Sequence, residues 1–165
     1  MEIQYLNYLL DNAKIIQGKY YETLEVLKIE TLENEINKSF PKAYKEFLYL
    51  TGGRPKIYDS GIDGGFTFTL ERQQYTKELL AENGFTFKQD IWVIAELDGG
   101  EQFDFFIFND PTAEDPENPP VYFFDANYFD DGVNASEKNI SRSFETFSEY
   151  VEGNASVRME EKGYL

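Results

Sequence analysis

Three short runs of β-branched and aromatic residues between positions 90 and 124 constrain the fold more than any other part of the chain. The runs cover residues 91–95, 103–108 and 121–124, and Asp-Gly or Pro-rich sequence bounds them. Runs of this length and composition are typical of strands. The short Asp-Gly-Gly turn at 98–100 predicts an antiparallel hairpin, because glycine tolerates positive φ. The nearly continuous apolar character predicts a sheet buried by helices on one face and by aromatic side chains or a loop on the other.

Segments with apolar residues at helical spacing surround this predicted sheet. The predicted helices are one over 3–13, one capped by Thr31, one from Pro41 to a stop at Gly52-Gly53, one through 75–80 that stops at Asn83-Gly84, and one over 144–151 that Ser143 caps and Gly153-Asn154 ends. Alternation over 66–70 predicts another strand. The last dozen residues are polar, and we expect them to be frayed.

The chain has 165 residues, which is enough for one domain with a proper core and short for two. Hydrophobic residues make up 41% and aromatic residues 17%, so large rings can build the core without disulfides. The sequence therefore predicts a single α+β domain. Its sheet is expected to be antiparallel, or mixed at most, and covered by several α-helices.

Cysteine and histidine are both absent. Their absence excludes a Ser-His-Asp triad, a Cys-His dyad, and thiolate or imidazole metal sites. We expect no metal site and no cofactor. The first six residues include an acid and no basic region, and no run is long and apolar enough to cross a bilayer. We therefore expect a cytoplasmic protein that does not associate with membranes.

The charge balance is the most informative bulk property. Acidic residues number 31 against 15 basic ones, for a formal net charge of -16. Such a charge repels nucleic-acid backbones and anionic membranes, and it attracts a basic partner. Solubility alone is the simpler interpretation of the same charge. We expect no nucleic-acid binding and a basic protein partner.

Between the second and third predicted strands, residues 109–120 carry four prolines and four acids. This composition is incompatible with a regular strand and predicts an exposed, partly extended loop whose acids lie in solvent. More acids follow the third strand. The predicted partner-binding residues are Asp110, Glu114, Asp115, Glu117, Asp130 and Asp131. An inert solvated loop is the alternative interpretation.

An enzyme is the alternative class, because two carboxylates can act as a catalytic pair. Four acids lie close in sequence around the predicted hairpin, namely Glu96, Asp98, Glu101 and Asp104. Ordinary turn chemistry explains such crowding equally well. A calcium loop over 125–132 is weaker still, because it lacks the ligand spacing and terminal Glu of an EF-hand.

Several of these features occur in an order that is shared with a known family. They are the helix start Phe40-Pro41, the stripe Tyr44, Phe47 and Leu48, the stop Gly52-Gly53, the turn at 98–100, the strand at Val121, and the terminal helix with Ser143, Phe144 and Phe147. This order resembles the SUKH superfamily, the Smi/Knr-type domains. The resemblance covers residues 22–152 and leaves an N-terminal helix (1–21) and a polar tail (153–165) outside.

The resemblance implies an α+β fold with helices packed on an antiparallel sheet, and no catalysis. It also implies a bacterial immunity protein that binds and neutralises a cognate polymorphic toxin of the nuclease or nucleic-acid deaminase type. A regulatory scaffold module, which eukaryotic relatives of the family resemble, is the alternative function. A carboxylate-based hydrolase is a third.

Overall fold

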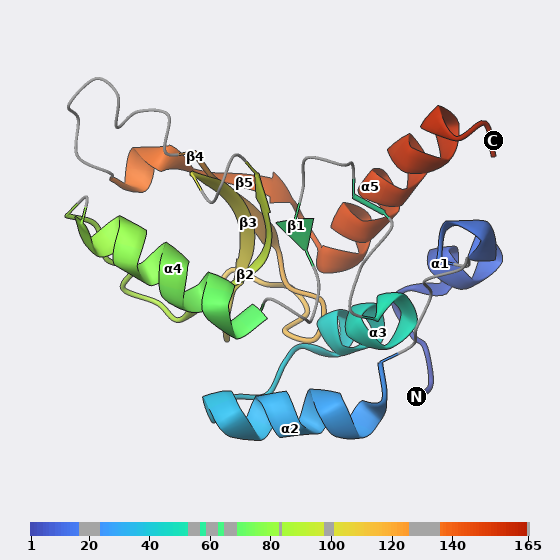
Figure 1. Cartoon of the computed structure of the whole chain (residues 1–165), viewed down its shortest axis with the longest axis horizontal. Helices are drawn as coiled ribbons and strands as arrows, with labels where there is room; N and C mark the ends of the chain where they lie inside the picture. Colours follow the sequence, from blue (N-terminus) through green and yellow to red (C-terminus); the bar gives the residue numbers. More distant parts are fainter. Residues whose placement is uncertain are drawn as a thin grey trace.

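The computed structural model describes residues 1–16, 24–52, 57–58, 63–64, 69–82, 84–97, 101–125 and 136–164. Within these ranges, five strands form one sheet in the order β1-β2-β3-β4-β5 (Figure 1). The strands are β1 (Asp63–Gly64), β2 (Ile91–Leu97), β3 (Gln102–Ile107), β4 (Val121–Asp125) and β5 (Ile140–Phe144). Every neighbouring pair is antiparallel. The predicted fold class and all three predicted central strands are confirmed.

Helices cover both faces of the sheet (Figure 1). The helical segments are α1 (Asn7–Asp11), η1 (Ala13–Ile15), α2 (Val26–Ile36), α3 (Lys42–Thr51), α4 (Thr69–Glu82), η5 (Glu137–Asn139) and α5 (Phe147–Glu161). Helix α4 lies on one side of the sheet, and α3 and α5 lie on the other. None of the helices within the described ranges combines the length and apolar character that a membrane crossing requires.

The core has two parts, one on each face of the sheet. Trp92 and Phe106 belong to the larger part, which the helices α1, α2, α3 and α5 complete. Phe105 belongs to the smaller part, together with Leu80 of α4 and the half-buried Phe87 that follows it. Trp92 and Phe105 are 3% and 0% exposed, which confirms that both are core residues. The two faces alternate along β3 because successive side chains of a strand point to opposite sides.

The hairpin of β2 and β3 forms the middle of the sheet. Its register pairs Ile91 with Ile107 and Leu97 with Gln102, with an irregularity between Val93 and Ala95. The predicted turn at 98–100 lies outside the described residues. The antiparallel pairing of its two flanking strands is nevertheless the one that the short turn predicts.

Helix α3 begins and ends where the sequence predicts. Pro41 occupies the N-cap position, so its missing N–H costs no helical hydrogen bond. At the other end, Gly52 has a φ of +62° and donates its N–H to the Leu48 carbonyl at 2.9 Å. A positive φ favours glycine, which explains why the helix stops at this residue. Gly53 lies outside the described residues.

The N-terminal helix is shorter than predicted, and a buried carboxylate binds the backbone of the residues that precede it. Glu46 of α3 is 0% exposed and accepts hydrogen bonds from the backbone N–H groups of Gln4, Tyr5 and Leu6 at 2.8 to 3.1 Å. These bonds replace the water that the carboxylate loses on burial. In the short helix α1, Leu9 is the buried residue and Leu10, which the predicted helix would bury, is 46% exposed.

Three predicted boundaries are wrong. Thr31 lies inside α2, where its hydroxyl donates to the Leu27 carbonyl instead of capping the helix. Residues 66–68 of the predicted strand 66–70 lie outside the described residues, and Thr69 and Leu70 already belong to α4. The last helix begins after Thr146 rather than Ser143, because Thr146 and Glu149 form a capping box.

The C-terminal region also differs from the prediction. Ser143 and Phe144 belong to strand β5, and α5 continues through Gly153 to Glu161. The expected fraying after Gly153 is wrong, because Ala155 and Met159 are buried against the core. A Cβ at Gly153 would lie 3.2 Å from the Phe144 ring, so glycine here allows the helix to approach β5 closely.

Candidate functional site

The acidic loop between β3 and β4 is held by its own carboxylates. Asp110 is only 6% exposed, and its Oδ1 accepts hydrogen bonds of 2.8 Å from both the N–H and the hydroxyl of Thr112. Its Oδ2 accepts a 2.7 Å hydrogen bond from the Tyr122 hydroxyl. Asp110 therefore ties the start of the loop to β4.

The second half of the loop is bound to the N-terminal region. Tyr5 donates its hydroxyl to Asp115 Oδ2 at 2.7 Å, and this hydrogen bond to a carboxylate raises the pKa of Tyr5 to about 12. Glu117 Oε2 accepts from the N–H of Lys42 at 2.7 Å, and the Glu117 carbonyl accepts from the N–H of Ala43 at 2.9 Å. Since the N-cap Pro41 has no capping side chain, Glu117 caps α3 from a distant part of the sequence.

These contacts correct the expectation that the four loop acids all lie in solvent. Asp110 is buried and Asp115 is half-buried, while Glu114 and Glu117 are exposed. The loop is thus an ordered cap over α3 with two exposed carboxylates. Asp130 and Asp131 lie outside the described residues, so the structure does not place them beside it.

Of the hairpin acids that the structure describes, Glu96 and Asp104 do not form the pair that a carboxylate hydrolase would need. Glu96 is opposite Phe103 and Asp104 is opposite Ala95, so the two carboxylates leave the sheet on opposite faces. Glu96 Oε2 instead lies 3.2 Å from the Arg72 guanidinium of α4. Asp98 lies outside the described residues, and Glu101 is exposed. Among the described side chains, no group of three acids could hold a metal ion.

Asp104 lies on the face of the sheet that α3 and α5 cover, beside two buried tyrosines. The Tyr150 hydroxyl donates to Asp104 Oδ2 at 3.1 Å and lies 3.2 Å from the Tyr58 hydroxyl. Burial disfavours the charged form and raises the pKa of Asp104 to about 6. A pocket of about 430 Å³ between β3, β5 and α5 reaches this carboxylate. The sequence placed Asp104 only in the crowded hairpin and did not indicate its burial.

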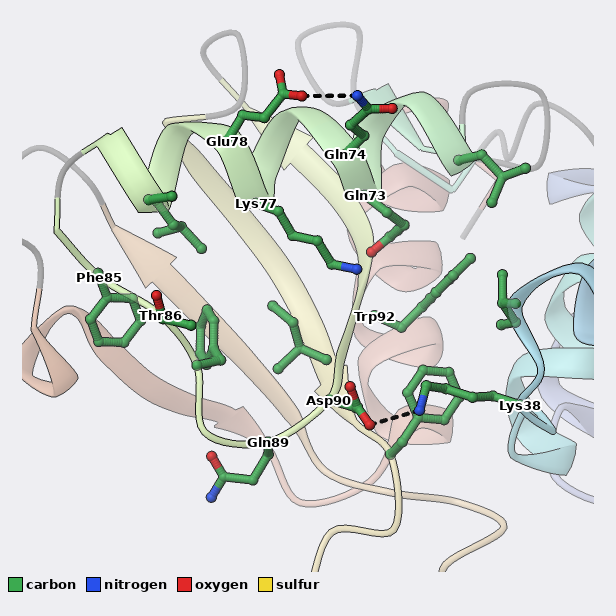
Figure 2. Close-up of a pocket in the computed structure, with 17 residues that line it drawn as sticks. Lys38, Gln73, Gln74, Lys77, Glu78, Phe85, Thr86, Gln89, Asp90 and Trp92 are labelled. Atoms are coloured by element: carbon green, nitrogen blue, oxygen red, sulfur yellow. Dashed lines mark hydrogen bonds and ion pairs between the residues drawn. The ribbon is translucent and has the colours of Figure 1, made fainter.

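A larger groove of about 740 Å³ lies between α4 and the start of β2 (Figure 2). The amide of Gln73 bonds both the N–H and the carbonyl of Val93, at 2.9 and 2.8 Å, and so occupies the place of a strand partner. Figure 2 shows Lys77 extending from α4 into the groove, on the same side as the ion pair of Lys38 and Asp90. The two atoms of that pair are 2.7 Å apart, and the bond from Lys38 lowers the pKa of Asp90.

The groove has a balanced charge, because Lys38 and Lys77 lie among Asp90 and Glu78. It is therefore not the acidic surface that the sequence predicts. Its hydrophobic lining comes from separate parts of the chain, such as Phe85 after α4 and Phe108 after β3. No local pattern in the sequence joins these residues, so the groove could not be predicted.

Comparison with known proteins decides the family. A family model described as the SMI1 / KNR4 family (SUKH-1) matches residues 26–153, most of the chain. The chain belongs to this family. No curated protein and no solved structure gives a significant match.

The SUKH match begins at the first residue of α2 and ends inside α5. It thus contains α3, the whole described sheet and the acidic loop. SUKH domains are, in general, non-catalytic binding domains of the toxin-immunity type. A protein is therefore the class of partner against which the loop, the groove and the Asp104 pocket have to be compared.

Proposed function

We propose that this SUKH domain is an immunity protein that binds and neutralises a cognate toxin, and that the toxin is a nuclease or a nucleic-acid deaminase. The observation that supports this choice within the family is the net charge of -16. A toxin that acts on nucleic acid needs a basic surface to hold phosphates. A strongly acidic domain is complementary to that surface and would compete with the substrate for it.

The same charge predicts how the complex forms. Long-range attraction raises the association rate of oppositely charged proteins and makes that rate fall with added salt. It also opposes binding of this domain to nucleic acid. We therefore propose a single basic protein partner, no nucleic-acid ligand, no catalysis and a cytoplasmic place of action.

We propose that the acidic loop contributes to the toxin-binding surface. Glu114 and Glu117 are exposed and can meet a cationic partner directly, whereas Asp110 and Asp115 hold the loop in shape through Thr112 and Tyr5. Asp130 and Asp131 remain part of the proposed surface because they continue the same acidic composition. An ordered loop loses less conformational entropy on binding than a free one, which favours this role.

The test uses a purified candidate toxin domain of the nuclease or deaminase type and measures association rates at two salt concentrations. The variant replaces Glu114 with Gln and Asp130 and Asp131 with Asn. The charge-matched control replaces Glu30, Glu35 and Glu82 with Gln, since all three are exposed and lie on α2 and α4. We expect the loop variant to associate at least about tenfold more slowly, with a weaker salt dependence, than the control.

Equal rates for the two triple variants would place the interface elsewhere on the domain. Absence of binding by the unmodified protein would contradict the immunity function. Recovery of a non-toxin partner in its place would favour the regulatory scaffold.

A further inference from the structure

The pocket that reaches Asp104 contains a negative charge without a matching positive one. Asp104 is half-buried on β3 and accepts one hydrogen bond, from Tyr150. Among the described residues, no Lys or Arg forms an ion pair with it. The lining includes one cation, Arg158, and its guanidinium lies 2.7 Å from the carboxylate of Glu161.

This arrangement is costly for the free protein. Removing a carboxylate from water disfavours its charge unless a cation or several donors replace the water. A neutral Asn could accept the same hydrogen bond from Tyr150 without that cost. A cation that entered the pocket would therefore gain more from Asp104 than from a fully solvated acid, because its partner has already lost part of its hydration.

The walls of the pocket match a long side chain that ends in a charge. Ile57, Phe144 and Val157 supply apolar surface, and Ser143 and Asn154 supply polar groups. The Asn154 amide nitrogen donates to the Tyr150 carbonyl at 2.9 Å, a bond that leaves its oxygen able to accept from another donor. Such a lining suits a methylene stem packed on apolar atoms with its charged head held by oxygen acceptors.

We propose that the Asp104 pocket receives an arginine side chain of the protein partner. The guanidinium pairs with the Asp104 carboxylate, and its stem packs against Ile57, Phe144 and Val157. Arginine fits better than lysine because its planar head carries five donors, and the lining includes the acceptor side chains of Asp104, Ser143 and Asn154. Buried arginines are also common anchors of protein interfaces. The identity of the partner rests on the proposed function, whereas the chemistry of the pocket does not.

The pocket can be tested without any toxin. N-acetyl-arginine amide is titrated into the isotope-labelled protein while NMR follows the Asp104 carboxyl carbon and the amides of Ser143 and Asn154. We expect saturable shifts at all three, and a pKa of Asp104 that falls below about 6 when the probe is bound. N-acetyl-citrulline amide, which has the same shape and no charge, should bind at least about tenfold more weakly.

Two variants complete the test. D104N should lose the response to the arginine probe, while E114Q, an exposed acid on the loop, should keep it. V157R is a second variant for the case in which D104N disturbs folding. Val157 is 59% exposed, so the substitution is compatible with the fold and places a cation at the pocket mouth that should block the probe.

Absence of saturable shifts, or equal binding of the arginine and citrulline probes, would overturn the proposal. A final arm measures the candidate toxin domain, for which D104N should weaken binding at least about tenfold. Unchanged toxin affinity of D104N would show that the partner does not use the pocket. Failure of either arm would leave the immunity function itself standing, because that function depends on toxin binding by the unmodified protein.

Discussion

The indole Nε1 of Trp92 donates a 2.9 Å hydrogen bond to the hydroxyl of Tyr44, and both side chains are buried. The bond joins β2 to α3. The centroid of the Phe40 ring lies 4.8 Å from that of Trp92 and 4.9 Å from that of Tyr44. Burial raises the pKa of Tyr44 above its ordinary value, so its hydroxyl stays protonated. This contact makes the sheet and the helix that follows Pro41 one packed unit.

Replacing Trp92 with Ala should destabilise the protein by about 3 to 5 kcal/mol, because it removes a large buried ring and leaves a cavity. Urea unfolding measures the change. Tyr75→Ala is the matched control, since Tyr75 is 47% exposed and its loss should cost about 0.5 kcal/mol or less. A Trp92→Ala protein as stable as the control would contradict the assignment of Trp92 to the core.

The strands could be predicted because their signals are local. Residues 91–95 and 121–124 are short apolar runs between turn residues, and both are strands in the structure. Strand β5 gave no such signal, since Ser141, Arg142 and Ser143 are exposed and only its ends are half-buried. It lies at the edge of the sheet, where one neighbour, β4, is enough to hold it.

The wrong predictions at the two ends of the last helix arise because contacts with β5, and not local sequence, fix these positions. Ser143 and Thr146 are both good N-cap residues, and the neighbouring β5 decides between them. Glycine is typical of helix C-termini, yet Gly153 lies inside α5, where it packs against Phe144. Tertiary contacts outweigh local preference at these positions.

The acidic loop could be located from its prolines and acids, but its contacts could not be predicted. Its hydrogen bonds to Tyr5 and Lys42 span 110 and 75 residues, and no local pattern reports them. Burial of Asp104 likewise depends on Tyr150, which is 46 residues away. Long-range partners of this kind decide which acids are structural and which are exposed.

Glu117→Gln should destabilise the protein by about 0.5 to 2 kcal/mol, because it removes the charge that caps α3. Asp110→Asn should cost about 1 to 3 kcal/mol, since an amide cannot accept all three hydrogen bonds that the Asp110 carboxylate accepts. Thermal or urea unfolding checks both values. Glu114→Gln, in the same loop, should stay within about 0.5 kcal/mol of the unmodified protein. If all three variants were as stable as the unmodified protein, the loop would not support the fold.

Asp104 should make the free protein more stable as pH falls from 7 to 4. Its folded pKa, about 6, is above the ordinary value near 3.9, so the folded state binds the proton more tightly. The stabilisation is complete below about pH 4 and is lost as pH rises through about 6; it amounts to about 3 kcal/mol at most. Unfolding of Asp104→Asn at the two pH values isolates this effect from the other acids. If the free energy of unfolding of the Asp104→Asn variant changed with pH as it does in the unmodified protein, the burial of the carboxylate would be contradicted.

Adding EDTA should leave the melting temperature unchanged. Histidine and cysteine are absent, and carboxylates alone suit hard cations that this fold is not expected to need. Differential scanning fluorimetry with and without the chelator measures the effect. A drop of several degrees would reveal a metal site linked to folding.

Neutralisation of the toxin's own activity is the most direct test of the proposed immunity function. The candidate toxin domain is assayed for cleavage or deamination of nucleic acid while the purified protein is added in increasing amounts. We expect the toxin's activity to fall to the background level near one molar equivalent, and a salt concentration well above physiological to weaken the inhibition. Full toxin activity at a large molar excess of the protein, at low salt, would contradict the proposed function.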